Sequence, residues 1–385
     1  MKYILLVCEG LADEPAEELQ GRTPLEVAKT PFMDHLAKKG EMGSALFTPH
    51  RLPPASDVAC MSLLGFDPEE FYTGIAPLEA AAMGVSQKDN EIVFRCDLVT
   101  VLDDVLFDTS ASGISPTESQ ILIKELNAKL KNPKVKIYPG EGYKNILVIS
   151  DPEMAEKLDE LECTPPQNLI AQKFVKHLPK GEGAPLITDL MDQSKVILED
   201  HEINRVRIDL NENPANIIWP WGQGKKPKLP SFKQRYGIEG SIITESDYAK
   251  GLGMALGLHV ATSIENALKE HDFLFIYTES GPDIYRTNDL KAKIKLLEDF
   301  DSQVVGNVVK RMEHFDAVRV LVSSDHAVSL AKRGAFHGHV PFILQGTGIP
   351  AGEMGPFNEK MAAQSKLVFN EGHKLMEFFL KRVAG

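Results

Sequence analysis

Four short apolar runs constrain the fold of this chain more than any other feature. They are YILLVCEG near the start and FLFIYTES, AVRVLVSS and VPFILQG in the last third of the sequence. Each run is of strand length and stops at a polar residue or glycine, as buried strands do. Residues 23–40, 289–313 and 359–382 instead space their apolar positions as helices do. This alternation predicts an α/β fold with a mostly parallel sheet and helices on both faces.

The middle of the sequence has a different pattern, which predicts a second module. EIVFRCDLVTVLDDVLFDTS indicates paired strands, and NAKLKNPKVKIYPGEGYKNILVIS indicates two more strands after a helix. Proline and glycine gather in NPANIIWPWGQGKKPKLPSF, residues 213–232, which predicts a loop-rich connection. We therefore expect one discontinuous domain, residues 1–87 and 229–385, and a smaller inserted α/β domain, residues 88–228.

Charge and cysteine usage restrict the partners and the compartment. A net charge of −13 argues against nucleic acids and anionic membranes, because phosphate groups attract basic surfaces. The opening apolar run is too short for a signal peptide and meets acidic residues at once. The four cysteines are scattered without a C-x-x-C pair. We expect a reduced, cytoplasmic protein that binds neither nucleic acid nor membrane.

Acidic residues and histidines stand at the ends of the predicted strands, where ligands bind in parallel sheets. They are Glu9, Asp283, Asp325 and His326 after strands, and His337 and His339 before the last one. Together they suggest a divalent-metal site with one or two ions. Each residue taken alone is more often a structural cap of a strand end.

Ser56 follows a proline-rich loop and precedes a segment with helical spacing in LPPASDVACMSLLGFDP. A serine at such a junction is most often the cap of the helix. The same position exposes a hydroxyl that could act as a nucleophile beside a metal. The sequence leaves both roles open.

Several segments resemble archaeal-type 2,3-bisphosphoglycerate-independent phosphoglycerate mutases, which belong to the alkaline phosphatase superfamily. They are GRTPLEVAKTPFMDHLAKKG, PASDVACMSLLGFDPEEFYTG, NPANIIWPWGQGKKPKLPSFKQRYG and SSDHAVS…AFHGHVPFIL. The resemblance implies a phosphatase-like metal-binding domain that carries an inserted substrate-binding domain. It also implies glycolytic interconversion of 3- and 2-phosphoglycerate through a phosphoserine, without 2,3-bisphosphoglycerate.

The resemblance assigns roles to individual residues. Ser56 would be the nucleophile, and Mn²⁺, Mg²⁺ or Zn²⁺ the metal. One ion would be held by Glu9, Ser56, Asp325 and His326, and the other by Asp283, position 287 and His337. The candidates for binding substrate are Asp57, Arg95, Arg205 and Arg207, to which we add Lys250 from DYAKGLG.

Several positions depart from the family pattern. Glu9 replaces the family's aspartate and can still bind a metal, whereas Thr287 replaces a histidine and is a poor ligand. Cys60 stands in place of a histidine, Ile75 in place of an arginine, and Thr109–Gly113 in place of a basic segment. Cys60 itself is expected to be a small buried residue.

Because of these departures, the sequence leaves two classes of function open. The first is a phosphoryl-transfer enzyme, with phosphoglycerate interconversion as the family default. The second is a degenerate or substrate-switched member that acts on another phosphorylated metabolite or serves as a binding or regulatory protein.

Overall fold

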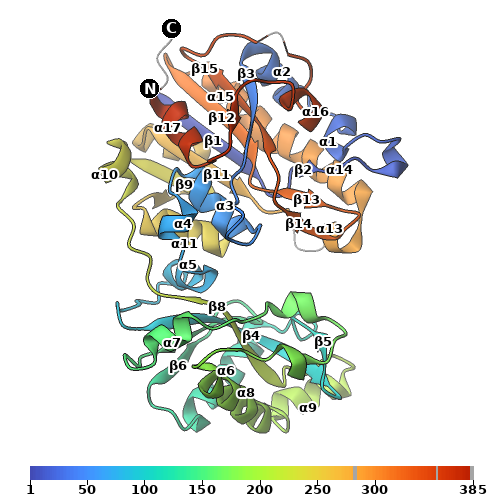
Figure 1. Cartoon of the computed structure of the whole chain (residues 1–385), viewed down its shortest axis with the longest axis vertical. Helices are drawn as coiled ribbons and strands as arrows, with labels where there is room; N and C mark the ends of the chain where they lie inside the picture. The colour runs from blue at the N-terminus through green and yellow to red at the C-terminus, as the bar shows by residue number, and fades with distance from the viewer. Residues whose placement is uncertain (281–283, 353, 382–385) are drawn as a thin grey trace. The chain divides into compact units, whose positions relative to one another are not determined.

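The computed structural model describes residues 1–280, 284–352 and 354–381, with residues 285 and 286 by backbone only. The chain forms two compact units (Figure 1), Met1–Tyr72 with Leu229–Gly385, and Thr73–Lys228. The second unit begins before the predicted boundary at residue 88, because α5 (Ile75–Ala82) packs on strands of that unit. No helix of the described residues is both long and apolar enough to cross a membrane.

The first unit is built on an eight-stranded sheet in the order β10-β9-β11-β1-β12-β15-β3-β16. Its strands are β1 (Lys2–Cys8), β3 (Glu41–Ala45), β9 (Gly240–Thr244), β10 (His259–Val260), β11 (Phe273–Thr278), β12 (Val318–Ser324), β15 (Val340–Gly346) and β16 (Val368–Phe369). Only β15 runs antiparallel to its neighbours, β12 and β3. The predicted mostly parallel sheet is confirmed.

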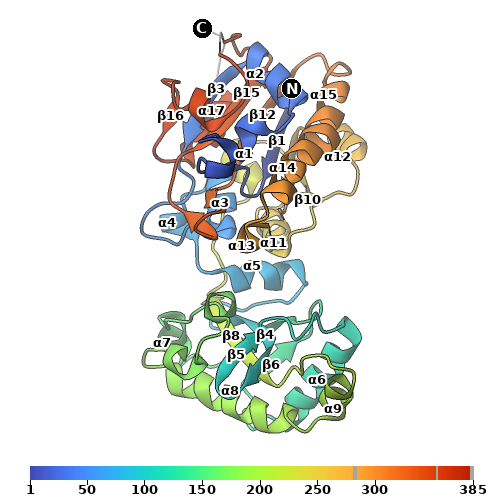
Figure 2. The same ribbon diagram turned by 90° about the vertical axis from the view of Figure 1, so that its right-hand side faces the viewer.

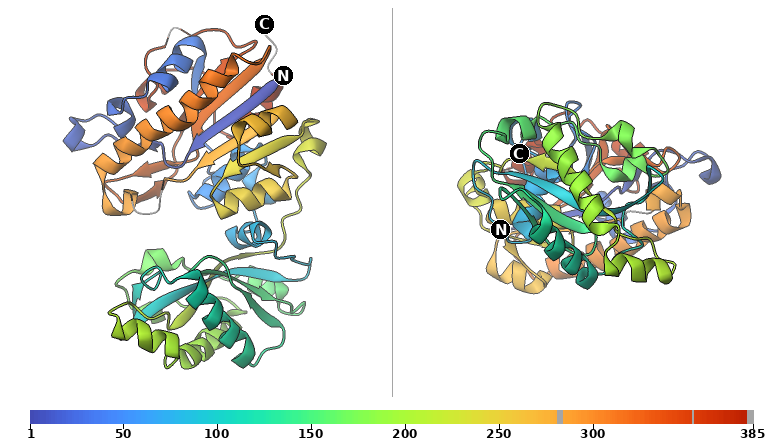
Figure 3. Two further views of the ribbon diagram at one scale, coloured as in Figure 1. Left: turned by 180° about the vertical axis from the view of Figure 1, so that it is seen from behind. Right: turned by 90° about the horizontal axis from the view of Figure 1, so that it is seen from below.

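Helices cover both faces of this sheet. On one face lie α14 (Leu290–Asp299), a π-helical segment (Phe300–Val305) and α15 (Gly306–Met312), which pack on Ile4 and Leu6 of β1 (Figure 2; Figure 3, left). On the opposite face, Phe379 of α17 (Lys374–Lys381) contacts Tyr3, whose side chain points away from its neighbour Ile4.

Two predicted helices are interrupted. Residues 359–382 form α16 (Glu359–Ala362) and α17 with β16 between them, since β16 pairs with β3. Residues 23–40 form α1 (Pro24–Val27) and α2 (Pro31–Lys39), because Pro31 starts a new helix. Thr30 does not cap α2; instead Asp301 accepts hydrogen bonds from the backbone N–H groups of Phe32 and Met33 at 3.2 and 2.7 Å.

Shorter elements complete the first unit. They are β2 (Ala12–Asp13), β13 (Ala327–Ser329), β14 (Gly334–Phe336), α3 (Ser56–Leu63), α4 (Pro68–Phe71), α10 (Phe232–Tyr236), α11 (Asp247–Ala255), α12 (Ile264–Glu270), α13 (Ile284–Thr287) and the 3₁₀ turn Glu17–Leu19.

The second unit centres on the long strand β4 (Ile92–Leu102). It pairs with β5 (Val105–Asp108), β7 (Lys144–Ile149) and β8 (Ile217–Gly224), and β7 pairs with β6 (Val135–Tyr138). Alternate β4 side chains enter different cores, with Ile92 and Phe94 in the larger one and Val93 in a smaller one with α5. Helices α6 (Pro116–Lys129) and α8 (Ala184–Leu198) lie over these strands (Figure 3, right).

Strand β8 interrupts the predicted loop-rich connection at 213–232, of which residues 213–216 and 225–231 form neither helix nor strand. Pro220 and Gly222 are tolerated in β8 because it is an edge strand, which pairs with β4 alone among the described strands. The register of this pair is also irregular near Val93 and Arg95. The remaining elements of this unit are α7 (Ala155–Asp159), α9 (Glu202–Asp209) and the 3₁₀ turns Pro166–Leu169 and Phe174–His177.

Candidate active site

The carboxyl ends of three parallel strands meet at one edge of the larger sheet. In the β1–β11 and β1–β12 registers, Cys8 lies opposite Thr278 and Ser324 respectively. Glu9 therefore leaves β1 between the segments that follow β11 and β12. Sequence reasoning placed Glu9, Asp325 and His326 at this edge, and the register brings them there.

Ser56 approaches this edge from α3. Ala55 is the N-cap residue of α3 and forms no side-chain cap, and Ser56 is the first residue of the helix. The Ser56 hydroxyl donates to Oε1 of Glu9 at 2.9 Å. The capping role that was the more frequent alternative is therefore wrong for Ser56. Ser56 is partly buried, and its hydroxyl faces a carboxylate.

Glu9 is held on both oxygens. Oε1 accepts from Ser56, and Oε2 accepts from the backbone N–H and the hydroxyl of Ser280 at 2.9 and 3.0 Å. Burial and the nearby charge of Asp325 raise the pKa of Glu9, while the hydrogen bonds from Ser280 and Ser56 oppose the rise. Two carboxylates therefore share a poorly solvated site.

Asp325 is fully buried and paired with His326. Its Oδ1 accepts from the backbone N–H groups of Gly10 and His326 at 2.8 and 2.7 Å and lies 2.9 Å from Nδ1 of His326. Burial disfavours charge on both groups, but their mutual attraction outweighs it. The pKa of Asp325 is lowered and the pKa of His326 is raised. The carboxylate and the imidazole at the end of β12 thus form an ion pair.

A pair of tyrosines stands behind Asp325. The Tyr277 hydroxyl donates to Oδ2 of Asp325 at 3.0 Å, and the Tyr248 hydroxyl lies 2.8 Å from that of Tyr277. Tyr277 is buried at the end of β11, and Tyr248 lies on α11. Burial raises the pKa of both phenols well above the usual value, so both retain their protons.

The donors at this edge suit a divalent cation by their chemistry. Two carboxylates, an imidazole and a hydroxyl make a mixed oxygen and nitrogen set, and a cation would relieve the repulsion between Glu9 and Asp325. In the arrangement described, these carboxylates face protein donors. Across residues 1–280, 284–352 and 354–381, no three His, Cys, Asp or Glu side chains are grouped as metal ligands. Binding a metal therefore requires Glu9 or Asp325 to exchange a hydrogen-bond partner, and it requires His326 to give up the proton that pairs it with Asp325.

The residues predicted for a second ion are only partly visible. Asp283 lies outside the described residues. Thr287 is exposed on α13, and its hydroxyl donates to the carbonyl of Ile284 at 3.4 Å. Nδ1 of His337 lies 3.1 Å from the carbonyl of Thr48, so this nitrogen is the donor of the hydrogen bond. His339 is committed elsewhere, 3.0 Å from the amide oxygen of Asn370.

Two of the predicted substrate-binding arginines are engaged inside the second unit. Arg95 pairs with Asp97 at 3.0 Å and Glu79 at 3.1 Å, and its guanidinium lies 4.9 Å from the ring centre of Trp221. Trp221 in turn donates to Asp97 at 2.9 Å.

Arg207 is engaged in the same way, by two partners close in sequence and two that are distant from it. It donates to Glu118 at 2.9 Å, pairs with Glu212 at 3.1 Å and also donates to the carbonyls of Asn213 and Ala111. Both buried guanidinium groups thus serve the interior of the unit.

The other predicted substrate-binding residues have different surroundings. Arg205 is exposed and lies 3.5 Å from Asp200. Asp57 is buried on α3 and accepts a hydrogen bond from Tyr72, and burial raises its pKa. Lys250 is partly buried on α11, the helix that carries Tyr248.

The departures from the family pattern also have structural settings. Cys60 is fully buried on α3, as expected, and burial raises the pKa of its thiol well above the usual value. Ile75 is the first residue of α5.

The segment 109–113 forms a turn around Asp108. Its carboxylate accepts from the N–H and hydroxyl of Ser110, the N–H of Ser112 and the amide of Asn213. Ser110 and Ser112 thus bind a carboxylate of the chain itself.

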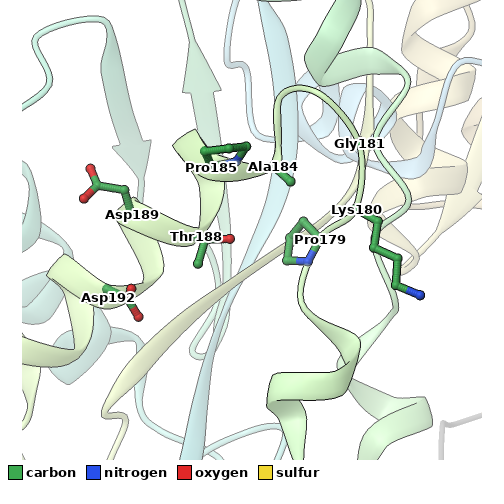
Figure 4. Close-up of a pocket in the computed structure, with 8 residues that line it drawn as sticks. All are labelled: Pro179, Lys180, Gly181, Ala184, Pro185, Thr188, Asp189 and Asp192. Carbon is green, nitrogen blue, oxygen red and sulfur yellow. The ribbon is translucent and has the colours of Figure 1, made fainter.

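Two surface hollows lie away from these residues. One, in the second unit, measures about 610 Å³ and is lined by Pro179, Lys180 and the start of α8 (Figure 4). Asp189 and Asp192 line the same hollow, which makes it unfavourable for an anion. The other, in the first unit, measures about 550 Å³ and is lined by residues that include Asp13, Arg22 and Glu359. Neither hollow includes Ser56, Glu9 or Asp325.

Known proteins match this chain over almost its whole length. A family model described as 2,3-bisphosphoglycerate-independent phosphoglycerate mutase matches residues 37–204. A probable enzyme of that name from Geobacter sulfurreducens is 36% identical, over 99% of this chain and 100% of its own length. The enzyme of Methanosarcina mazei is 38% identical, over 91% of this chain and 92% of its own. The chain belongs to the family of 2,3-bisphosphoglycerate-independent phosphoglycerate mutases.

A solved structure agrees with the fold. A protein of Pyrococcus horikoshii matches with a TM-score of 0.79 at 25% identity, over 99% of this chain and 97% of its own. The resemblance to phosphoglycerate mutases noted from the sequence is confirmed, and so is the α/β fold with a mostly parallel sheet and helices on both faces.

In this member of the phosphoglycerate mutase family, sequence reasoning missed three polar residues of the site. Ser280, Tyr277 and Tyr248 all contact the predicted ligands or each other. Ser280 follows β11 by two positions, so the rule that collected Glu9 and Asp325 could have found it. Tyr277 sits in an apolar run, where a phenol ring is indistinguishable from core packing.

Proposed function

We propose that the chain interconverts 3-phosphoglycerate and 2-phosphoglycerate through a phosphoserine at Ser56. The observation that carries the proposal is the Ser56 hydroxyl, 2.9 Å from Glu9 at the sheet edge that bears the Asp325–His326 pair. Membership of the phosphoglycerate mutase family supplies the substrate. The partner is accordingly a small phosphorylated metabolite.

The geometry around Ser56 suits a nucleophile. The hydroxyl proton points to Glu9, so the lone pairs of Oγ remain available to phosphorus. Ser56 opens α3, and the N–H groups of the first helical turn favour the negative charge of a phosphoryl group. In the forward step the bond from phosphorus to the substrate 3-oxygen breaks as the bond to Oγ forms. The return step transfers the group to the 2-hydroxyl of the same glycerate.

A divalent metal, for which we favour Mn²⁺ with Mg²⁺ or Zn²⁺ as alternatives, fits the donors at this edge. Glu9, Ser56, Asp325 and His326 would hold one ion. Asp283 and His337 are the proposed ligands of a second, with Thr287 a poor third. A bound ion would lower the pKa of the serine hydroxyl and neutralise phosphoryl charge. We assign metal binding to the first unit and substrate binding to the second.

Turnover is expected to be slower than the family pattern would give. An arginine that grips an anion forms charge-assisted, bidentate hydrogen bonds. Each one lost costs about 1.5–3 kcal/mol. Ile75 and the self-bonded turn at 109–113 offer no guanidinium, and Arg95 and Arg207 are engaged internally. Loss of several such contacts lowers the rate by powers of ten.

The test is direct. Purified full-length chain with Mn²⁺ and 3-phosphoglycerate should form 2-phosphoglycerate, followed by phosphorus NMR. Ser56→Ala should abolish product, whereas Ser263→Ala, which removes a helix-capping hydroxyl on α12, should keep it. Intact mass spectrometry should detect a phosphoryl adduct on the wild-type chain and none on Ser56→Ala. Undiminished product from Ser56→Ala would refute the phosphoserine.

A further inference from the structure

The two oxygens of Asp325 have unequal capacity for a ligand. Oδ1 already accepts two backbone N–H groups, from Gly10 and His326, and lies beside Nδ1 of His326. Among the described residues, Oδ2 accepts only the hydroxyl of Tyr277. A carboxylate oxygen offers about two lone-pair positions. Oδ1 is therefore saturated, and Oδ2 is the oxygen that can take a further partner.

The bond to Oδ2 belongs to a chain with a fixed direction. Tyr277 has a single hydroxyl proton, which it donates to Asp325. The Tyr248 hydroxyl, 2.8 Å away, must then be the donor to Tyr277. The sequence of donors runs from Tyr248 through Tyr277 to Oδ2, and each bond polarises the next.

Tyr277 reaches its acceptor across a strand. In the sheet order, β1 lies between β11, which carries Tyr277, and β12, which Asp325 follows. Val7 of β1 is the register partner of both Tyr277 and Ser323, and all three are buried. The phenol is thus fixed by packing before it makes any hydrogen bond.

We propose that Tyr277, supported by Tyr248, is a positioning residue that orients Oδ2 of Asp325 toward a divalent cation. This inference rests on the proposed function. Neither tyrosine touches substrate or cation; both act through Asp325, in the way that outer partners orient the ligands of metal sites. Without the Tyr277 hydroxyl, the carboxylate loses the hydrogen bond that fixes Oδ2.

The test compares tyrosine-to-phenylalanine variants of the full chain after metal removal with a chelator. Titration calorimetry with Mn²⁺ should give a dissociation constant about 10–100-fold weaker for Tyr277→Phe than for wild type, the range for outer partners of metal ligands. Tyr248→Phe, which leaves the bond to Oδ2 in place, should weaken binding in the same direction by a smaller factor.

Tyr236→Phe is the matched control. It removes a hydroxyl of the same unit that donates to the carbonyl of Gly65 at 3.1 Å and, among the described residues, makes no hydrogen bond to Asp325. Its Mn²⁺ affinity should equal that of wild type. Thermal unfolding of the metal-free variants separates folding from metal affinity, since a purely structural role would lower stability and leave the affinity of the folded protein unchanged.

The outcomes distinguish this inference from the proposed function. Equal Mn²⁺ affinity of Tyr277→Phe and wild type, or equal weakening by Tyr236→Phe, overturns the positioning role and leaves the mutase proposal standing. Wild-type protein that binds Mn²⁺ as expected but forms no 2-phosphoglycerate overturns the mutase proposal alone. Wild-type protein that binds none of Mn²⁺, Mg²⁺ and Zn²⁺ overturns both.

Discussion

Replacing Arg207 by methionine tests whether this arginine serves substrate or structure. The side chain is buried within the second unit and satisfies two backbone carbonyls, those of Asn213 and Ala111. A hydrogen bond from a charged donor contributes about 1.5–3 kcal/mol. The lower value for each carbonyl gives about 3 kcal/mol. Its carboxylate partners Glu118 and Glu212 are 28% and 47% exposed, so water compensates them and their pairs add little.

The two tryptophans make the assay specific. Trp219 and Trp221 are the only tryptophans in the sequence, and both lie on β8. Urea unfolding followed by tryptophan fluorescence therefore reports the second unit. With a slope of about 2 kcal/mol per molar urea, Arg207→Met should lower the midpoint by about 1.5 M.

Arg205→Met is the control, because Arg205 is 67% exposed and its replacement should change stability by under about 0.5 kcal/mol. An Arg207→Met protein with the wild-type midpoint but lost affinity for 3-phosphoglycerate would refute the structural role. It would return Arg207 to the substrate-binding set implied by the family.

Two further predictions concern carboxylates. Burial alone would raise the pKa of Asp108, but hydrogen bonds from Asn213, Ser110 and Ser112 outweigh it and the pKa is lowered. The stabilisation from Asp108 is therefore present above the unfolded pKa of about 3.9 and is lost as pH falls through the folded value. Asp108→Asn should narrow the gap between urea midpoints at pH 7 and pH 3, and an unchanged gap would contradict this. Asp301→Ala removes the acceptor that caps α2, and it should lower the free energy of unfolding by about 1–2 kcal/mol in thermal unfolding. The control is Asp299→Ala, which changes a carboxylate on the solvent side of the helix. Equal losses of stability in the two variants would contradict the capping role of Asp301.

The sequence predicted what depends on local pattern. The runs that became β1, β11, β12 and β15 needed only length and polarity, and the rule about strand ends then located Glu9 and Asp325. Strand β8 was not predicted, because Pro220 and Gly222 are typical of a loop. Only its pairing with β4, which the sequence does not show, identifies it as a strand. Ser56 remained undecided because a cap and a nucleophile have the same local sequence, and only Glu9, distant in sequence, distinguishes them.

Partners distant in sequence also explain the arginines. Arg207 resembles a substrate residue until its acceptors at Ala111 and Glu118 are seen. Those contacts depend on how α9 packs against the turn at 108–113, and no spacing in the sequence reveals that. For the same reason Tyr277 was missed, because its acceptor follows a different strand.

The position of β1 between β11 and β12 bears on how the chain is made. The ribosome synthesises β1 (Lys2–Cys8) long before the two strands that pair with it. These strands, β11 and β12, begin at Phe273 and Val318. The segment Thr73–Lys228 emerges whole in the interval and contains all its own strand partners. The apolar β1 segment of the nascent chain therefore remains unpaired until β11 and β12 have been synthesised, and an unpaired apolar segment favours aggregation. We therefore expect the unpaired β1 segment to be the part of the nascent chain that needs a chaperone during synthesis.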